Sequence, residues 1–163
     1  MEIIKAKSPE HVEVLEKMAA EIWRQYYVPI IGIAQVEYML GKFQSIEAIQ
    51  NQIDGGQEYY LLKNGNVKIG YFSFYQKGEN LFLSKIYIHH TLRSRGYGKR
   101  CMDFIMDQAA AKKLKNIELT VNKYNIRSIE VYKKLGFHTI GSLVMDIGGG
   151  FVMDDFVLRK KVK

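Results

Sequence analysis

The segment that most constrains the fold runs from Leu81 to Ile105, because it joins a strand, a glycine turn and a helix without a linker. Residues 81–90 are rich in β-branched and aromatic side chains, which is typical of a strand. Gly96 and Gly98 stand one residue apart in the turn, and apolar residues at helical spacing follow directly. This succession predicts a fold in which helices pack on a sheet.

The N-terminal part predicts one strand and two helices. Residues 2–7 have the composition of a short strand, and Ser8-Pro9 begins a helix because serine caps well and proline fits the first turn. This helix is expected to end near Pro29, because the residue before a proline disfavours the helical conformation. A second amphipathic helix is predicted over residues 35–53, where a following glycine pair stops it.

The rest of the chain is predicted to be mostly strands. The runs at 57–63 and 67–76 flank Asn64-Gly65-Asn66, which is typical of a β-hairpin. The order of elements indicates an α/β (α+β) fold in one domain over residues 1–163, with a mostly antiparallel sheet of about seven strands and about four helices on its faces. The later predicted elements are a helix at about 97–113, a strand at 116–122, a helix at 125–135, and a closing hairpin of residues 138–147 and 151–159.

Composition excludes several classes of protein. The single cysteine, Cys101, excludes a disulfide framework and a multi-cysteine zinc site, and no metal is expected. No apolar run approaches the ~20 residues needed to cross a bilayer, and the N-terminus lacks the apolar core of a signal peptide. These features predict a soluble, cytoplasmic protein without a membrane partner. The formal net charge of +7 indicates an anionic partner of unspecified kind.

The glycine turn at residues 93–98 predicts a phosphate-binding site. A helix N-terminus leaves about four backbone N–H groups without partners and carries partial positive charge. Gly96 and Gly98 would let a ligand come close to this backbone. Together these features indicate a site for a pyrophosphate or a multiply phosphorylated ligand. The nearby cations are Arg93, Arg95, Lys99 and Arg100.

Three other kinds of glycine loop do not fit the turn. A P-loop needs Ser or Thr after its lysine, but Arg100 follows Lys99. A dinucleotide-binding loop needs a third glycine where Cys101 stands. A kinase glycine loop lies in a hairpin and not at the start of a helix.

Two motifs carry a resemblance to a known family. Arg93-Ser94-Arg95-Gly96-Tyr97-Gly98 resembles the R/Q-x-x-G-x-G/A motif of the GNAT superfamily of N-acetyltransferases. Residues 119–137, LTVNKYNIRSIEVYKKLGF, are similar to that family's L-x-V-x-x-x-N-x-x-A-x-x-x-Y-x-K-x-G-F stretch. Ser128 replaces the usual alanine. The matching positions are Asn125, Tyr132, Lys134, Gly136 and Phe137.

The resemblance implies acetyl-coenzyme A as cosubstrate. It implies that backbone amides from Ser94 to Lys99 hold the pyrophosphate, and that the main chain of Ile86 and Ile88 pairs with the pantetheine arm as an added strand would. Lys134 would reach the ribose 3′-phosphate. The residues expected at the coenzyme are Ile86, Ile88, Arg93, Ser94, Arg95, Gly96, Tyr97, Gly98, Lys99, Asn122, Asn125, Ser128, Tyr132 and Lys134.

Amine acetylation needs a donor for the oxyanion and a proton for the leaving thiolate. Asn125, Ser128 and Tyr132 are spaced three and four apart and therefore share one helix face. Tyr132 is the candidate general acid, which the resemblance also implies; its alternative role is packing near Phe137. The resemblance alone makes the Ile88 N–H the oxyanion donor.

No residue is assigned as the general base. The strand before the glycine turn, LFLSKIYI, holds no carboxylate. His89 and His90 at its end are expected to be turn residues, and Glu79 would reach only if the strand begins inside the pocket. Deprotonation through ordered water, with Ser84 in the relay, fits equally well.

The acceptor is expected to be a primary amine. Asp146, Asp154 and Asp155 could attract it, or could instead form a charged strand edge that discourages aggregation. The resemblance places the acceptor between the first two helices and the last hairpin, which is weakly similar to that of bacterial polyamine N-acetyltransferases. The expected substrate-binding residues are Tyr26, Tyr27, Tyr38, Ser84 and Asp154.

The resulting expectation is an acetyl-CoA-dependent N-acetyltransferase that acts on a small-molecule, polyamine-like or peptide amine by direct attack in a ternary complex. One alternative is an acyl-CoA-binding regulator with little turnover. Another is a basic nucleic-acid-binding domain, but the cations gather at one turn and no stacking platform is evident, so no nucleic-acid partner is expected. The sequence does not indicate an oligomeric state, and a homodimer is the commonest assembly.

Overall fold

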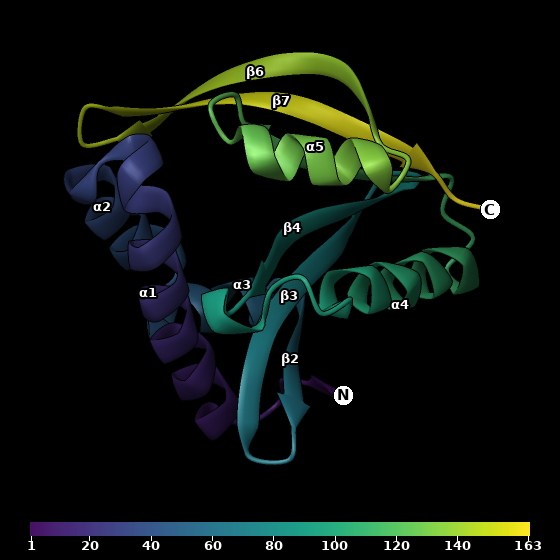
Figure 1. Cartoon of the computed structure of the whole chain (residues 1–163), viewed down its shortest axis with the longest axis horizontal. Helices are drawn as coiled ribbons and strands as arrows, with labels where there is room; N and C mark the ends of the chain where they lie inside the picture. Colours follow the sequence, from purple (N-terminus) through teal and green to yellow (C-terminus); the bar gives the residue numbers. More distant parts are fainter. The chain divides into compact units, whose positions relative to one another are not determined.

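The computed structural model describes residues 1–163 (Figure 1). Seven strands form one sheet in the order β1-β2-β3-β4-β5-β7-β6, with β4 parallel to β5. The α/β fold, the strand number and the closing hairpin predicted above are confirmed. The elements are β1 (Glu2–Lys5), α1 (Pro9–Ile31), α2 (Ile33–Phe43), α3 (Ile46–Asp54), β2 (Glu58–Asn64), β3 (Val67–Lys77), β4 (Asn80–Ile88), the 3₁₀-helix η1 (His90–Leu92), α4 (Tyr97–Ala111), β5 (Asn116–Asn122), α5 (Ile126–Lys134), β6 (His138–Gly148) and β7 (Phe151–Lys161).

The chain forms two compact units. The first unit comprises Met1–Tyr75 and Lys85–Cys101, and the second comprises Gln76–Ser84 and Met102–Lys163. No helix of the chain combines the length and the apolar character that crossing a bilayer requires.

The core of the first unit lies between the helices α1–α3 and the strands β1–β4. Ser8 caps α1, and its Oγ accepts a hydrogen bond from the His11 N–H over 3.3 Å. The apolar face of α1 is buried, and this burial stabilises the helix more than helix propensity alone could. The largest fully buried side chains of the unit are Leu15, Ile22, Ile49, Tyr59, Leu62, Ile69, Tyr71, Phe72 and Phe74.

The first helix continues two residues beyond its predicted end at Pro29, to Ile31. The helix contains Pro29 and ends only at Gly32, which has φ +82° and whose N–H donates to the Val28 carbonyl over 2.9 Å. A proline so near the end removes one backbone donor, and only two helical residues follow it. Gly32 ends the helix because it adopts a positive φ without strain.

The predicted helix over residues 35–53 is in fact two helices, which raises the number of α-helices to five. The break lies at Gln44-Ser45, where the Ser45 Oγ accepts from the Ala48 N–H over 3.1 Å and begins α3. Gln44 is buried, and its Oε1 accepts from the Tyr71 hydroxyl over 3.1 Å. This buried hydrogen bond fixes the break against β3.

The second unit is built on the parallel pairing of β4 with β5 and the antiparallel pairing of β5 with β7. The first pairing covers Asn80–Phe82 against Asn116–Glu118. The fully or nearly fully buried side chains of the second unit include Leu81, Met102, Ile105, Ile117, Leu119 and Leu158. In the closing hairpin, β6 pairs with β7 alone and ends the strand order.

Gly70 on β3 is required by the close approach of β4. A Cβ at this position would lie 2.1 Å from the Tyr87 carbonyl oxygen and 3.1 Å from the Ile88 Cα. Because both are backbone atoms, Gly70→Ala is expected to lower the free energy of unfolding by about 1–3 kcal/mol through overpacking. Urea denaturation measures this change.

Gly41 offers the matched control for Gly70. It lies inside α2, and a Cβ there would meet nothing within 4 Å. Gly41→Ala is therefore expected to raise stability by roughly 0.5–1 kcal/mol. Equal effects of the two substitutions would contradict the close approach of β4 to Gly70.

Candidate functional site

The predicted phosphate-binding turn lies in the first unit and has an unusual backbone. Ser94 has φ +63° and Gly96 has φ +80°, so two left-handed residues are separated by a single residue. A positive φ is uncommon for a residue other than glycine. Left-handed residues next to ordinary ones form concave nests of N–H groups that bind anions.

The N–H groups of this turn have no partner within the protein. No hydrogen bond takes up those of Ser94, Arg95, Gly96, Tyr97 and Gly98. The first turn of α4 carries no acidic residue, so the positive end of the helix is not neutralised locally. Five consecutive donors at a helix N-terminus can bind an anion that has several oxygens, such as a diphosphate.

Both turn glycines leave open space over the backbone. A Cβ at Gly96 or at Gly98 would meet no heavy atom within 4 Å. Gly98 lies inside α4 and has no positive φ, so the backbone conformation does not require glycine there. A glycine in a helix lowers stability relative to alanine. Because Gly98 has no side chain, a ligand can reach the main chain of the first turn of α4.

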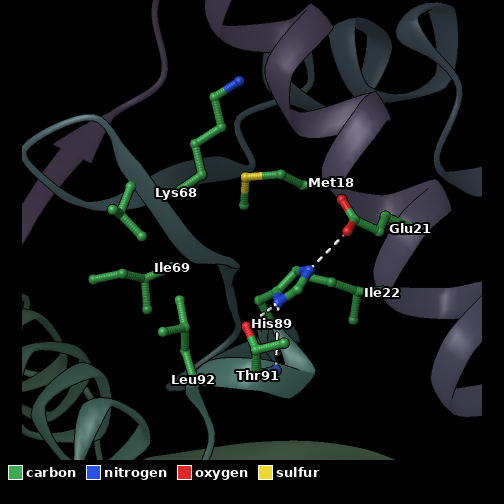
Figure 2. A pocket seen from close by; sticks show the side chains of 9 residues that line it. Met18, Glu21, Ile22, Lys68, Ile69, His89, Thr91 and Leu92 are labelled. Carbon is green, nitrogen blue, oxygen red and sulfur yellow. Dashed lines mark hydrogen bonds and ion pairs between the residues drawn. The ribbon is translucent and has the colours of Figure 1, made fainter.

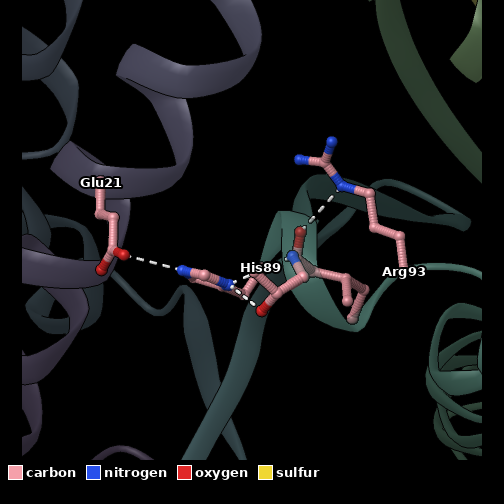
Figure 3. Close-up of polar contacts among 5 residues, drawn as sticks. Glu21, His89 and Arg93 are labelled. Carbon is pink, nitrogen blue, oxygen red and sulfur yellow. Dashed lines mark hydrogen bonds and ion pairs between the residues drawn. The ribbon is translucent and has the colours of Figure 1, made fainter.

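Arg93 differs from the other cations of the turn. Its Nε donates to the Ile88 carbonyl over 3.1 Å (Figure 3). Its guanidinium lies 4.7 Å from the centre of the Tyr26 ring. Arg93 thus connects the end of β4 to α1. Arg95, Lys99 and Arg100 are exposed around the turn.

The end of β4 offers main-chain groups on the side away from β3. The His89 N–H donates to the Ile69 carbonyl over 2.8 Å, so residue 89 faces β3. N–H and C=O directions alternate along a strand. Ile86 and Ile88 therefore point their main-chain groups away from β3, as the expected pairing with an added strand requires.

His89 is held in the turn, as expected. Its Nδ1 accepts from the Thr91 N–H over 3.4 Å, and its Nε2 lies 2.7 Å from Glu21 Oε1 on α1 (Figure 3). The Nδ1 also lies 2.8 Å from the Thr91 Oγ1. The pair connects the segment before the glycine turn to α1. His90 is exposed.

A pocket of about 250 Å³ adjoins the Glu21–His89 pair (Figure 2). Its residues come from α1, from the start of β3 and from the segment after β4, so no local sequence pattern could predict it. The lining residues are Met18, Glu21, Ile22, Val67, Lys68, Ile69, His89, Thr91 and Leu92. The pocket contains none of the predicted coenzyme or substrate residues.

Two of the predicted substrate aromatics lie together. The ring centres of Tyr26 and Tyr27 are 5.0 Å apart, and Tyr27 also contacts Trp23 at 4.6 Å. Tyr87 of β4 joins this cluster, at 6.1 Å from Tyr27. Tyr38 lies on α2, where the Lys42 Nζ is 5.7 Å from its ring centre. The sequence does not predict Tyr87 as part of this cluster, because a tyrosine in a strand is typical of a residue that only packs against its neighbours.

Lys85 is a buried titratable residue that the sequence analysis did not single out. It is 7% exposed, and its Nζ donates to Gln52 Oε1 over 2.9 Å, an atom that also accepts from the Tyr59 hydroxyl. Burial lowers the pKa of Lys85 to about 7. The alternation of buried and exposed positions along β4 indicates that Lys85 is buried, because it follows the buried residues Leu81 and Leu83 at the same two-residue spacing.

The lowered pKa of Lys85 predicts a pH-dependent stability. The unfolded chain keeps this lysine protonated up to about pH 10.4. Between the two pKa values the unfolded state binds more protons, so stability rises with pH from about 7 to 10, by roughly 3–4 kcal/mol. Chemical denaturation at several pH values should show this rise for the wild type and not for Lys85→Met. If the free energy of unfolding changed with pH in the same way for the wild type and Lys85→Met, the buried Lys85 would not have a lowered pKa.

In the second unit, the predicted helix-face residues lie on or next to α5. Asn125 is buried and caps the helix, and its Oδ1 accepts from the Ser128 N–H over 3.3 Å. Tyr132 is half-buried and meets the edge of Phe137, with ring centres 5.7 Å apart. Lys134 is exposed in the last turn. The Asn122 Oδ1 accepts from the Tyr124 N–H over 2.9 Å.

Asp146 and Asp154 lie on the same face of the closing hairpin, because Asp154 pairs with Val144 and Asp146 pairs with Val152. Asp154 lies 2.7 Å from Lys123 Nζ, and the Asp146 Oδ1 accepts from the Gly148 N–H over 2.8 Å. Asp155 is buried, and this burial raises its pKa to about 6. Because successive strand residues point to opposite faces, Asp155 points away from the face that carries Asp154. The charge of Asp154 is thus partly neutralised within the unit. Ser84 is half-buried on β4.

Comparison with known proteins gives both a family and a fold. The model of the acetyltransferase (GNAT) family matches residues 15–137. The thialysine N-epsilon-acetyltransferase of Bos taurus is 33% identical over 67 residues, which are 40% of this chain and 39% of that protein. This chain therefore aligns with well under half the length of that relative.

Two solved structures illustrate the likeness in fold. The PaiA N-acetyltransferase of Thermoplasma acidophilum, solved with coenzyme A, has a TM-score of 0.79 at 22% identity and covers 99% of both chains. A GCN5-related N-acetyltransferase of Rhodopseudomonas palustris has a TM-score of 0.81 at 16% identity, over 98% of this chain and 94% of that one. At these identities the likeness is one of fold.

Proposed function

The chain belongs to the acetyltransferase (GNAT) family. We propose that it is an acetyl-CoA-dependent N-acetyltransferase that acetylates a primary amine of a small molecule or peptide by direct attack. One observation carries this proposal: the five N–H groups from Ser94 to Gly98 have no acceptor within the protein. A coenzyme with a diphosphate matches such a row of donors.

The coenzyme is proposed to extend from this turn along β4. The N–H groups at residues 94–99 hold the diphosphate, with Arg95 and Lys99 adding charge, and Ile86 and Ile88 offer main-chain groups to the pantetheine amides. Arg93 contributes by fixing the Ile88 carbonyl. On the second unit the proposed contacts are Asn122, Asn125, Ser128, Tyr132 and Lys134. The family model spans parts of both units, which supports one catalytic domain over residues 1–163.

The proposed reaction needs no covalent enzyme intermediate. The neutral amine nitrogen attacks the thioester carbonyl carbon, the carbon–sulfur bond breaks, and Tyr132 protonates the departing thiolate. The amine nitrogen gives up one proton to water, and the Tyr132 phenolate regains one proton from water. The Ile88 N–H stabilises the oxyanion. Burial raises the pKa of Cys101 to about 12, which supports direct attack because this thiol is a poor nucleophile.

The acceptor is proposed to be polyamine-like, and the reaction to take place in the cytoplasm. The name of the similar thialysine N-epsilon-acetyltransferase supports a small amine. Tyr27 and Tyr38 remain the proposed aromatic contacts. Because the Arg93 guanidinium already lies over the Tyr26 ring, Tyr26 is proposed to shape the site and not to bind the acceptor cation through that face.

Binding and turnover test the proposal separately. Acetyl-CoA should raise the melting temperature by mass action, and duplex DNA should not. An acceptor screen of polyamines, amino acids, peptides and aminoglycosides, followed by release of free thiol, should identify at least one amine substrate. Coenzyme binding with no thiol release for any amine would instead favour an acyl-CoA-binding regulator.

A further inference from the structure

The buried carboxylate of Asp155 in the second unit has no ion pair. Asp155 lies on β7 and is 4% exposed, and no lysine, arginine or histidine forms an ion pair with it. The nearby Lys123 ammonium lies 2.7 Å from the neighbouring Asp154 instead. Carboxylates are almost never fully buried unless they are paired, because burial removes the hydration of the charge. A buried carboxylate without a counter-ion is therefore a candidate functional group.

Asp155 lies on the polar face of the β5–β7 pair. It is paired with Asn122, and directly paired residues point to the same face of a sheet. Because side chains alternate along a strand, Thr120 shares this face, and its hydroxyl is within hydrogen-bonding reach of the carboxylate. The opposite face carries the buried pair Leu119 and Leu158. The Asp155 carboxylate thus lies among polar groups and not in the apolar core.

The end of β5 beside Asp155 is open on its other side. β5 pairs with β4 only over Asn116–Glu118, whereas it pairs with β7 as far as Asn122. From residue 119 onward, the main chain of β5 therefore has no partner strand on the β4 side. The Asn125 N–H donates to the Asn122 carbonyl over 3.0 Å, which joins this open end to the start of α5. Asp155 thus lies beside residues that are proposed to contact the coenzyme.

We propose that Asp155 is the general base that makes the acceptor amine neutral, an assignment that rests on the proposed function. The acceptor enters as an ammonium ion, which the buried carboxylate attracts. One nitrogen–hydrogen bond breaks, and its proton moves to a carboxylate oxygen of Asp155. The nitrogen keeps the electron pair and attacks the thioester as proposed above. Asp155 afterwards releases its proton to water, so that both the charge and the proton are balanced.

Burial makes this proton transfer more favourable. Burial raises the pKa of Asp155 to about 6, while the Thr120 hydroxyl and Lys123 lower it and Asp154 raises it. Asp155 is therefore ionised at neutral pH and can accept a proton. The same burial lowers the pKa of a bound ammonium group, because it disfavours the charged form. The transfer converts two buried ions into two neutral groups.

No other carboxylate on this polar face is free of a cation. β6 places the apolar Leu143 opposite Asp155. The next charged side chains along the face are Glu118 and Arg159, four residues away along each strand, or about 13 Å. The Arg159 Nε donates to the Glu118 Oε1 over 2.9 Å, so these two charges neutralise each other. Asp155 is thus the acidic group of this face that can act as a base.

The pH dependence of kcat/KM tests the assignment, with spermidine as the first acceptor, the other screened amines after it, and thiol release as the readout. A base lets the wild type use the ammonium form, so its kcat/KM should stay level between about pH 7 and 9. Asp155→Asn can use only the neutral amine, which is about 1 part in 2,500 at pH 7 for a pKa of about 10.4. Its kcat/KM should therefore rise about tenfold per pH unit, from a value at least about 100-fold below that of the wild type at pH 7.

Glu118→Gln is the matched control, because it removes from the same face a carboxylate that is already paired with Arg159. Its pH profile should match that of the wild type. Asp155→Asn should bind coenzyme A normally in isothermal titration, and thermal melts report whether each variant is folded.

The outcomes separate this assignment from the proposed function. No thiol release by the wild type with spermidine or any other screened amine would overturn both. Thiol release with parallel pH profiles of the wild type and Asp155→Asn would overturn the base alone. A tenfold rise per pH unit in the wild type between about pH 7 and 9 would also overturn it, and this measurement needs no variant.

Discussion

Replacing Gly98 by valine is expected to weaken coenzyme A binding by a factor of roughly 100 or more. The new side chain would project into the open space over the first turn of α4, where a Cβ meets no protein atom within 4 Å. It would keep a diphosphate away from the N–H groups of Tyr97 and Gly98. Two lost hydrogen bonds to a charged group, at about 1.5–3 kcal/mol each, account for that factor.

Gly41→Val is the matched control for Gly98→Val. Both glycines lie inside a helix, and a Cβ at either position meets nothing within 4 Å. The two variants therefore change helix propensity by a similar amount, but only Gly98 adjoins the unpartnered N–H groups. Isothermal titration with coenzyme A should separate them. Normal affinity of Gly98→Val would mean that the diphosphate binds elsewhere.

Replacing Tyr132 by phenylalanine is expected to lower turnover by roughly 10- to 10,000-fold while coenzyme A binds normally. The substitution removes only the hydroxyl, and a general acid contributes about 10²–10⁴ to rate. The edge contact with Phe137, at 5.7 Å between ring centres, can be kept by phenylalanine. The change should therefore appear in kcat and not in coenzyme affinity.

Tyr124→Phe controls for the loss of a hydroxyl from the same segment. Tyr124 precedes α5, and its side chain is 72% exposed. Thiol release by this variant should match that of the wild type. Unchanged turnover of Tyr132→Phe would remove Tyr132 from the mechanism and leave it a packing residue.

The strands and the glycine turn could be predicted because local sequence determines them. Asn64-Gly65-Asn66 specifies its hairpin, with Gly65 at φ +59°. Gly96 and Gly98 mark the turn before α4 in the same way. The split of residues 35–53 could not be predicted, because the buried hydrogen bond from Tyr71 to Gln44 joins segments 27 residues apart.

The chemistry of the candidate site was only partly readable from the sequence. The row of N–H donors follows from a glycine turn that enters a helix. By contrast, the contact of Arg93 with Tyr26 and the pair of His89 with Glu21 depend on how α1 packs against the end of β4. The buried state of Lys85 likewise depends on Gln52, which comes from a distant helix. Such long-range contacts leave no local pattern.

Amide NMR during titration with coenzyme A tests the central claim most directly. If the main chain at residues 94–98 holds the diphosphate, the N–H signals of these five residues should shift together as the coenzyme saturates the protein. Pantetheine, which lacks the diphosphate, should leave them in place. Saturation by coenzyme A with these five signals unmoved would contradict the account.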